Sequence, residues 1–146
     1  MEEKKLLKYA VDYLSKYDSS KKNLVSVLKR KIFKLNTINY EKGKLYKKIN
    51  NIIKRLEENN LLNDDRYCSA KINSLLNVGN SKKFIFNYLI KKGIDANLIQ
   101  LNFEELFTNK HDWEIESAKL FAKKKKLLDS SENYEKKLAK MARAGF

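Results

Sequence analysis

The sequence has no proline, only four glycines and a single cysteine among its 146 residues. The lack of proline and the scarcity of glycine favour helices over a turn-rich β fold. The lone cysteine, Cys68, excludes an intramolecular disulfide and is typical of a protein in a reducing cytoplasm. The longest apolar runs are a few residues, too short to span a membrane, and the N-terminus lacks the apolar segment of a secretory signal. We therefore expect a helical, cytoplasmic protein.

Side chains for catalysis and metal binding are also scarce. His111 is the only histidine, so a histidine metal site or a catalytic triad would lack partners. Cys68 has no candidate base nearby in the sequence, and its apolar neighbours predict a buried helix face. Gly43-Lys44 lacks the preceding glycine of a phosphate-binding loop. The sequence therefore predicts no enzyme activity, no metal site and no cofactor.

Acidic residues are outnumbered, and the resulting net charge of +14 is unevenly distributed. Residues 1–62 have 16 basic residues against 7 acidic ones, a net charge of +9, whereas residues 63–110 and 111–146 have +2 and +3. A field of this sign attracts polyanions, and nucleic acid is the partner we expect first. The alternative is a charged surface that only maintains solubility.

A repeat is present in the sequence. Tyr9–Lys31 aligns without a gap on Ala70–Lys92, at an offset of 61 residues, so that Ser20 falls on Ser81. A third copy begins at Ser117-Ala118, which is similar to Ser69-Ala70. A helical unit repeated in tandem predicts an extended scaffold for a long partner rather than a pocket around one active site.

Apolar spacing predicts an all-α fold of about eight helices, arranged as an elongated tandem array of three-helix units. The first unit, residues 1–62, is strongly basic, and Ser19 or Ser20 is expected to cap its second helix. Residues 36–44 are predicted to form a loop. The inner faces of its three helices are expected to be Leu7, Val11 and Leu14; Leu24, Leu28, Ile32 and Leu35; and Leu45, Ile49, Ile52, Ile53 and Leu56.

The second unit, residues 63–109, contains stronger boundary signals. Asn63 is a predicted N-cap, and Leu62 and Tyr67 occupy the positions of a hydrophobic staple. Ser81 is expected to cap the next helix, and Gly93 to end it in a Schellman motif. The helix after that is expected to be capped by Asp95 and to bury Leu98, Ile99, Phe103 and Leu106.

The third unit, residues 110–146, is expected to be truncated to two helices. The first starts near Asp112, and the second covers about residues 133–143, with Leu138 and Met141 inside. Because each unit is too small to enclose its own core, neighbouring units are expected to share buried faces.

Three stretches of the sequence resemble one bacterial family. Leu56–Tyr67 has the sequence LEENNLLNDDRY and is followed by Gly79-Asn80-Ser81 and by Leu89–Asp95, LIKKGID. These stretches and their order resemble the RecX family of recombination regulators. The closing segment Ala139–Phe146, AKMARAGF, resembles the Arg-Gly-Phe ending of that family, and YLSKYDSSKKNLVSVLKRK is similar to alphaproteobacterial members. Residues 38–48, rich in Lys and Asn, match no family pattern.

The resemblance implies a function in DNA repair, DNA recombination and the SOS response. It implies a non-enzymatic protein that binds filaments of the recombinase RecA and modulates, mainly inhibits, their ATPase, recombinase and coprotease activities. Some family members also contact DNA. We expect a monomer whose own binding to single- or double-stranded DNA is weak and salt-dependent. The alternatives are a basic helical nucleic-acid-binding protein without RecA specificity and a scaffold for an acidic protein.

Candidate contact residues are basic. On a helical wheel, Lys22, Lys29 and Arg30 lie opposite the apolar side of the second helix, and we call them the basic row. Lysines after the seventh predicted helix form a second patch, although they also complement its dipole. The alternative to partner contact is that all of these cations only form a solvated face of the protein. The full set of candidates for RecA or DNA contact is Lys21, Lys22, Lys29, Arg30, Lys34, Lys82, Lys83, Lys91, Lys92, Lys123, Lys124, Lys125, Lys126 and Arg143.

Aromatic residues do not form a regular ladder for single strands. Phe33 nevertheless falls on the polar side of the second helix. It is either an exposed anchor for a partner or, as we favour here, a residue that turns into a core junction where the helix ends.

Overall fold

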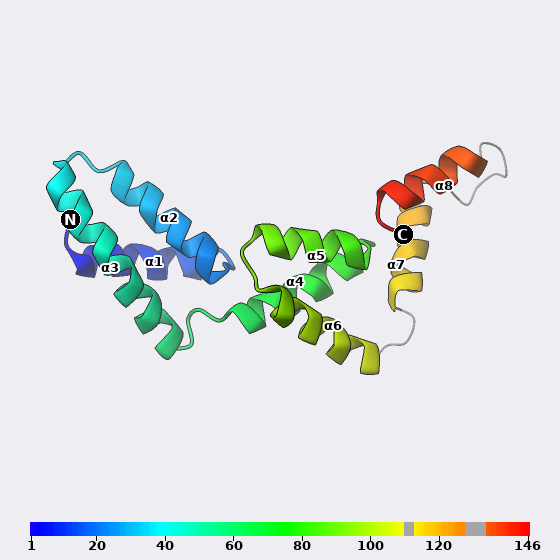
Figure 1. The fold of residues 1–146 in the computed structure, drawn as a ribbon, viewed down its shortest axis with the longest axis horizontal. Helices are drawn as coiled ribbons and strands as arrows, with labels where there is room; N and C mark the ends of the chain where they lie inside the picture. The colour runs from blue at the N-terminus through cyan, green and yellow to red at the C-terminus, as the bar shows by residue number, and fades with distance from the viewer. Residues whose placement is uncertain (110–112, 128–133) are drawn as a thin grey trace. The chain divides into compact units, whose positions relative to one another are not determined.

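The computed structural model describes residues 1–109, 113–127 and 134–146, and these residues form helices and connecting turns without a strand (Figure 1). The all-α prediction is confirmed. The only histidine, His111, and the predicted start of the third unit at Asp112 lie outside the described residues. The helices are α1 Glu3–Lys16, α2 Lys21–Phe33, α3 Asn39–Glu58, α4 Asp64–Asn77, α5 Lys82–Lys91, α6 Ala96–Asn109, α7 Trp113–Lys124 and α8 Tyr134–Arg143.

The chain divides into two compact units, Met1–Tyr67 and Cys68–Phe146. In the first unit, α1, α2 and α3 pack against one another around a single apolar core. Most predicted inner positions of α2 and α3 are buried, which confirms these two faces. The core residues are Leu6, Ala10, Leu24, Leu28, Ile32, Leu45, Ile49, Ile52, Ile53, Leu56 and Leu62.

The inner face of α1 differs from the predicted one. Leu6 and Ala10 are fully buried, Leu7 and Leu14 are half-buried, and Val11 is 38% exposed. Val11 follows Ala10 directly and is therefore rotated by about 100° from the centre of the buried stripe. The prediction that Val11 faces the core is wrong.

The predicted loop over residues 36–44 is too long. Helix α3 already begins at Asn39, and the N–H of Lys42 donates to the Ile38 carbonyl oxygen at 3.2 Å. Gly43, which belongs to the predicted loop, lies inside α3, where a glycine costs only about 1 kcal/mol relative to alanine. Glu41 in the first turn complements the helix dipole and favours the early start.

The predicted caps are confirmed. The N–H of Arg66 donates to Asn63 Oδ1 at 3.0 Å, and the N–H of Phe84 donates to Ser81 Oγ at 3.1 Å. The N–H of Asn97 donates to Asp95 Oδ1 at 2.7 Å. Gly93 has a φ of 83°, and the N–H of the residue after it donates to the Leu89 carbonyl oxygen at 3.1 Å, as in a Schellman motif. The staple residues Leu62 and Tyr67 are both buried.

The second unit buries apolar side chains of α4, α5 and α6, and α5 packs against α6. Ile72, Ile85, Leu89, Ile99 and Phe103 are completely buried. The predicted inner residues Leu98 and Leu106 of α6 are half-buried.

Helix α7 lies on the turn between α4 and α5. Gly79 has a φ of 90°, and a Cβ there would lie 3.1 Å from the Phe121 backbone nitrogen. The buried Ser117 hydroxyl donates a hydrogen bond to the Asn80 carbonyl oxygen in the same turn. Only a residue without a side chain allows α7 to approach this turn so closely.

Helix α8 packs against α7, and its apolar face is only partly covered. Met141 is half-buried, whereas Leu138 is 51% exposed, so the prediction that Leu138 lies inside is wrong. A pair of helices encloses less apolar surface than a three-helix unit, which leaves one side of α8 exposed to solvent.

Candidate binding surface

The basic row lies on the outer side of α2. Ser20 caps this helix by accepting a 3.2 Å hydrogen bond from the Asn23 N–H, and the opposite side is anchored by the completely buried Leu24 and Leu28. Lys22, Lys29 and Arg30 are exposed, as the helical wheel predicts. Lys34 is exposed just beyond the helix end. Three cations along one face can bind phosphates or carboxylates without disturbing the core.

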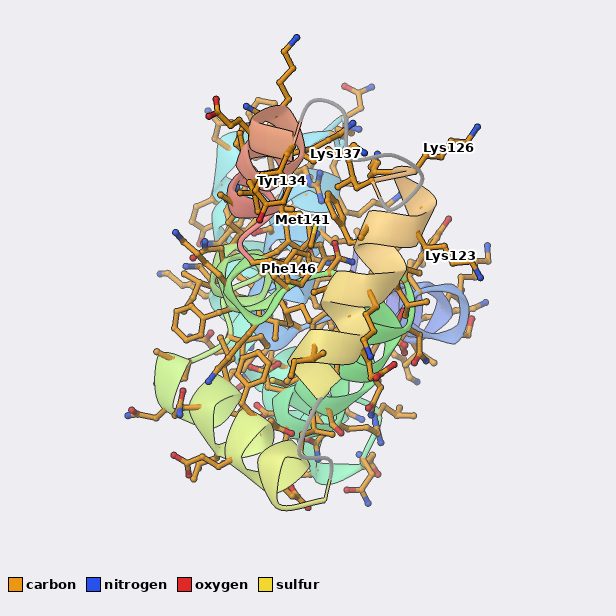
Figure 2. The ribbon with its side chains drawn as sticks, turned by 90° about the vertical axis from the view of Figure 1, so that its right-hand side faces the viewer. Lys123, Lys126, Tyr134, Lys137, Met141 and Phe146 are labelled. Atoms are coloured by element: carbon orange, nitrogen blue, oxygen red, sulfur yellow. The ribbon has the colours of Figure 1, made fainter. Side chains whose placement is uncertain are left out.

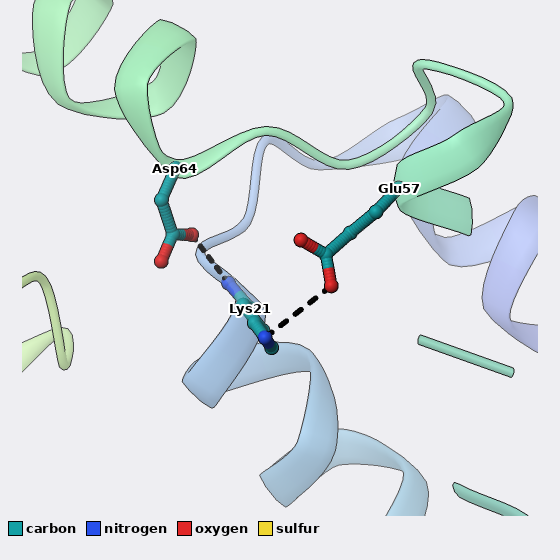
Figure 3. Close-up of polar contacts among 3 residues, drawn as sticks. All are labelled: Lys21, Glu57 and Asp64. Carbon is teal, nitrogen blue, oxygen red and sulfur yellow. Dashed lines mark hydrogen bonds and ion pairs between the residues drawn. The ribbon is translucent and has the colours of Figure 1, made fainter. Parts of the chain in front are cut away.

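Lys21, at the start of the same helix, has acidic partners within the chain. Its N–H donates to Asp64 Oδ1 at 2.8 Å, and its ammonium lies 3.3 Å from Glu57 Oε1 (Figure 3). Glu57 lies in the last turn of α3, and Asp64 begins α4. The two acids on either side of the α3–α4 connection therefore both contact the first turn of α2. These contacts weaken the prediction that Lys21 binds RecA or DNA.

The junction of α2 and α3 exposes aromatic rings beside cations. Phe33 is 73% exposed, so its predicted turn into the core is wrong. Lys42 donates from Nζ to the Phe33 carbonyl oxygen at 2.8 Å and lies 5.5 Å from the Phe33 ring centroid. Tyr40 is 68% exposed, and Lys44 Nζ lies 4.6 Å from its ring centroid.

Sequence reasoning missed Tyr40, Lys42 and Lys44 as surface residues of interest because it placed them in a loop. The signal that could have drawn attention to this region was Phe33, because the helical wheel places it on the polar side of α2. Because α3 starts at Asn39, Tyr40, Lys42 and Lys44 belong to its first turns, and the two lysines lie over the Phe33 and Tyr40 rings.

The four predicted contact lysines of α5 do not share one outer face. Lys83 and Lys91 are exposed, whereas Lys82 and Lys92 are half-buried. Lys82 and Lys92 lie over the rings of Phe103 and Tyr88, with Nζ 5.4 and 5.6 Å from the centroids. On the wheel they flank the buried Ile85–Leu89 side, so their stems extend along the apolar surface.

The C-terminal cations are exposed. Lys123 and Lys124 form the last turn of α7, Lys125 and Lys126 follow it, and Lys123 and Lys126 project outward (Figure 2). These charges complement the C-terminal end of the helix dipole. Arg143 is the exposed last residue of α8.

The fold brings the end of α8 to the start of α5. A Cβ on Gly145 would lie 3.3 Å from Lys83 Cβ. Lys83 and Arg143, predicted as contact residues from distant parts of the sequence, therefore come from neighbouring segments of the second unit.

Neither a metal cluster nor a membrane span is found where the structure is described. No three His, Cys, Asp or Glu side chains of these residues are grouped to hold a metal ion. Cys68 forms no disulfide and is completely buried, as its apolar neighbours predict. None of the described helices combines the length and the apolar character needed to cross a bilayer.

The sequence is similar over most of its length to a curated protein from Myxococcus xanthus, "Regulatory protein RecX". The two are 30% identical over 146 residues, which cover 94% of this chain and 76% of the relative. The chain belongs to the RecX family. No protein-family model matches it.

Two solved RecX structures have the same fold. RecX from Lactobacillus salivarius superposes with a TM-score of 0.69 at 24% identity, over 97% of this chain and 84% of the other. A second structure, of regulatory protein RecX, gives a TM-score of 0.71 at 21% identity, over 99% of this chain and 66% of the other. Because the identities are only 24% and 21%, these two structures support the fold of this chain and nothing further.

Proposed function

We propose that this RecX family member is a non-enzymatic regulator that binds the RecA filament and mainly inhibits its ATPase, recombinase and coprotease activities during DNA repair and recombination. The observation that supports the proposal is the 30% identity to a regulatory protein RecX over 94% of the chain. The exposed basic row of α2 and the net charge of +14 suit a partner that is itself a polyanion assembly.

The basic row is the surface we assign to the filament. Lys22, Lys29 and Arg30 lie on one face of a helix whose other face is fully buried, so partner contact at these side chains needs no rearrangement of the core. Lys83 and Lys91 supply the corresponding charges on α5. Repeated basic faces would suit a partner that also repeats along its length.

The tandem organisation supports the same proposal. Ser20 and Ser81, 61 positions apart, have nearly identical cap geometry, with φ and ψ of −77° and 159° in the first and −76° and 160° in the second. The match fits a repeat that relates the first two proposed units, residues 1–62 and 63–109, and the third unit at 110–146 stays a prediction.

The decisive experiment is single-stranded-DNA-dependent ATP hydrolysis by RecA with this protein titrated in. We expect hydrolysis to fall at amounts well below those of RecA, with little competition for the DNA. Loss of hydrolysis only when this protein saturates the DNA would instead support the second candidate, a basic nucleic-acid-binding protein without RecA specificity. That candidate is favoured by the exposed rings and lysines at the α2–α3 junction.

Several finer expectations stay predictions. They are the closer relation to alphaproteobacterial members, a cytoplasmic location and a monomeric state. A mass measurement in solution at two protein concentrations tests the last of these.

A further inference from the structure

Helices α2 and α5 occupy equivalent positions in the repeat. Each begins directly after its capping serine, and the two serines have nearly the same backbone conformation. The offset of 61 residues also relates the buried sides of the helices, because the completely buried Ile85 and Leu89 of α5 fall on Leu24 and Leu28 of α2. The two helices therefore share one inner face, and their outer faces can be compared position by position.

The outer faces of the two helices differ in chemistry. In each helix, five residues lie within about 120° of one another, opposite the buried side. In α2 they are all polar or basic, namely Lys22, Asn23, Ser26, Lys29 and Arg30. In α5 they are Lys83, Phe84, Asn87, Ile90 and Lys91, and we call these five residues the α5 face. A cation stands at both ends of each face, but α5 has apolar residues where α2 has Asn23 and Lys29.

The side chains of the α5 face are open to solvent. Phe84 is 46% exposed and Ile90 is 41% exposed, and the three polar residues around them are exposed as well. Within the described part of the chain, neither Lys83 nor Lys91 forms an ion pair. Both the apolar and the basic groups of the α5 face are thus accessible to a partner.

We propose that the α5 face binds an amphipathic helix of a partner protein. Apolar side chains of that helix cover Phe84 and Ile90, and its carboxylates pair with the two lysines. Lys83 and Lys91 are eight residues apart, about 12 Å along the helix axis. Acidic residues about seven or eight positions apart on the partner helix have nearly the same spacing, and helices pack side by side through such rows of side chains.

This inference rests on the proposed function and divides it between the two repeats. A RecA filament on single-stranded DNA presents both protein and a polyanion. An aliphatic side chain such as Ile90 gains nothing from a phosphate, whereas apolar side chains of a protein remove it from water. The chemistry of the α5 face therefore fits the protein component, and the all-polar outer face of α2 fits charged groups.

The test exchanges the α5 face for its counterpart on α2. Phe84→Asn/Ile90→Lys gives these two positions the residues found in α2 and raises the net charge by one. The matched control, Val78→Asn/Leu101→Lys, makes the same change in charge at two residues of the second unit that are 56% and 61% exposed. Inhibition of RecA ATP hydrolysis is titrated for the parent and both variants, and circular dichroism checks that all three are folded.

We expect the Phe84→Asn/Ile90→Lys protein to need at least about ten-fold more protein for half-inhibition, because buried apolar anchors contribute much of the affinity of protein interfaces. The control should act like the parent. Binding of a labelled oligothymidine strand without RecA separates protein contact from charge. The exchange adds a cation, so this binding should be equal to that of the parent or tighter.

Three results would overturn the proposal. The first is that the folded Phe84→Asn/Ile90→Lys protein inhibits RecA like the parent, or is weakened no more than the control. The second is inhibition that increases together with strand affinity, which would assign the α5 face to a polyanion. The third is loss, in this variant alone, of sedimentation with phosphatidylglycerol vesicles, which would assign the face to a lipid surface.

Failure of this inference is distinguishable from failure of the proposed function. A parent protein that does not inhibit RecA at all refutes the proposed function and this inference with it. Normal inhibition by both the parent and the Phe84→Asn/Ile90→Lys protein refutes only the assignment of the α5 face.

Discussion

The Ser81 hydroxyl donates a 2.6 Å hydrogen bond to the carbonyl oxygen of Ala144, a residue 63 positions later in the chain. The same hydroxyl accepts from the Phe84 N–H, so one side chain both caps α5 and binds the end of α8. The Phe146 ring then packs on Phe121, with centroids 5.5 Å apart. These polar and aromatic contacts attach the C-terminal segment to the start of α5 and to α7.

Gly145 makes this attachment possible, and Gly145→Ala should disrupt it. Gly145 has a φ of 96°, and a Cβ there would overlap the Ser81 hydroxyl. We expect a loss of about 1–3 kcal/mol in the stability of the C-terminal attachment, from backbone strain and from displacement of the hydrogen bond. Hydrogen exchange should report faster amide exchange in α8 and unchanged exchange in α1–α3.

Gly43→Ala is the matched control for this substitution. Gly43 lies inside α3, and a Cβ there meets no atom within 4 Å. The extra methyl group should stabilise the first unit by about 0.5–1 kcal/mol, because alanine loses less backbone entropy in a helix. Equal destabilisation by both substitutions would contradict the role assigned to Gly145.

Lys126→Gly should stabilise the end of α7. Lys126 has a φ of 57°, and the N–H of Leu127 donates to the Ala122 carbonyl oxygen at 2.8 Å, so Lys126 occupies the left-handed position of a Schellman motif. Glycine removes the steric cost of a Cβ at that position, which we put at about 1 kcal/mol. Lys125→Gly removes the same charge at a residue without positive φ and should be neutral or destabilising. Urea denaturation of both variants at equal ionic strength checks whether Lys126→Gly is the more stable of the two.

Asp64→Ala should destabilise the first unit by about 1 kcal/mol, as loss of a helix-capping hydrogen bond does. The carboxylate accepts from the Lys21 N–H at 2.8 Å at the start of α2, where backbone donors have no partner within the helix. Glu57→Gln removes only the 3.3 Å ion pair to the exposed Lys21 ammonium and should change stability by less than about 0.5 kcal/mol. Asp64→Asn keeps an acceptor oxygen and should fall between the two in a denaturant titration. A larger loss of stability in Glu57→Gln than in Asp64→Ala would show that the ion pair, and not the backbone hydrogen bond, stabilises the contact of α2 with the α3–α4 connection.

Reversing the charge of the basic row should weaken the action on RecA and leave the fold intact. Lys22→Glu/Lys29→Glu/Arg30→Glu changes three exposed side chains opposite the buried face of α2. Lys4→Glu/Lys5→Glu/Lys8→Glu makes the same change in net charge on exposed residues of α1. We expect inhibition of RecA ATP hydrolysis to need at least about ten-fold more of the first variant, while circular dichroism shows unchanged helicity in both. Equal weakening by the two variants would mean that only the overall charge matters.

The candidate surface could be predicted only in part. Exposure of Lys22, Lys29 and Arg30 follows from the angular positions of Leu24 and Leu28 on one helix, so a wheel was sufficient. Lys82 is half-buried with its Nζ over the Phe103 ring, which belongs to another helix, so a wheel of α5 alone could not predict it. Tyr40, Lys42 and Lys44 could not be placed on α3 from the sequence, because the predicted loop over residues 36–44 hid the true start of this helix at Asn39.

Local chemistry sets where several helices of this protein begin and end. Ser20, Ser81, Asn63 and Asp95 cap helices through backbone groups two or three residues away, and Gly93 ends α5 through its own backbone freedom, so these boundaries need no distant partner. Packing between helices, in contrast, determines whether an apolar side chain at the margin of a buried face is covered. Val11 and Leu138 are exposed because burial depends on the position of a neighbouring helix, and that position results from packing of the whole unit rather than from the periodicity of one segment.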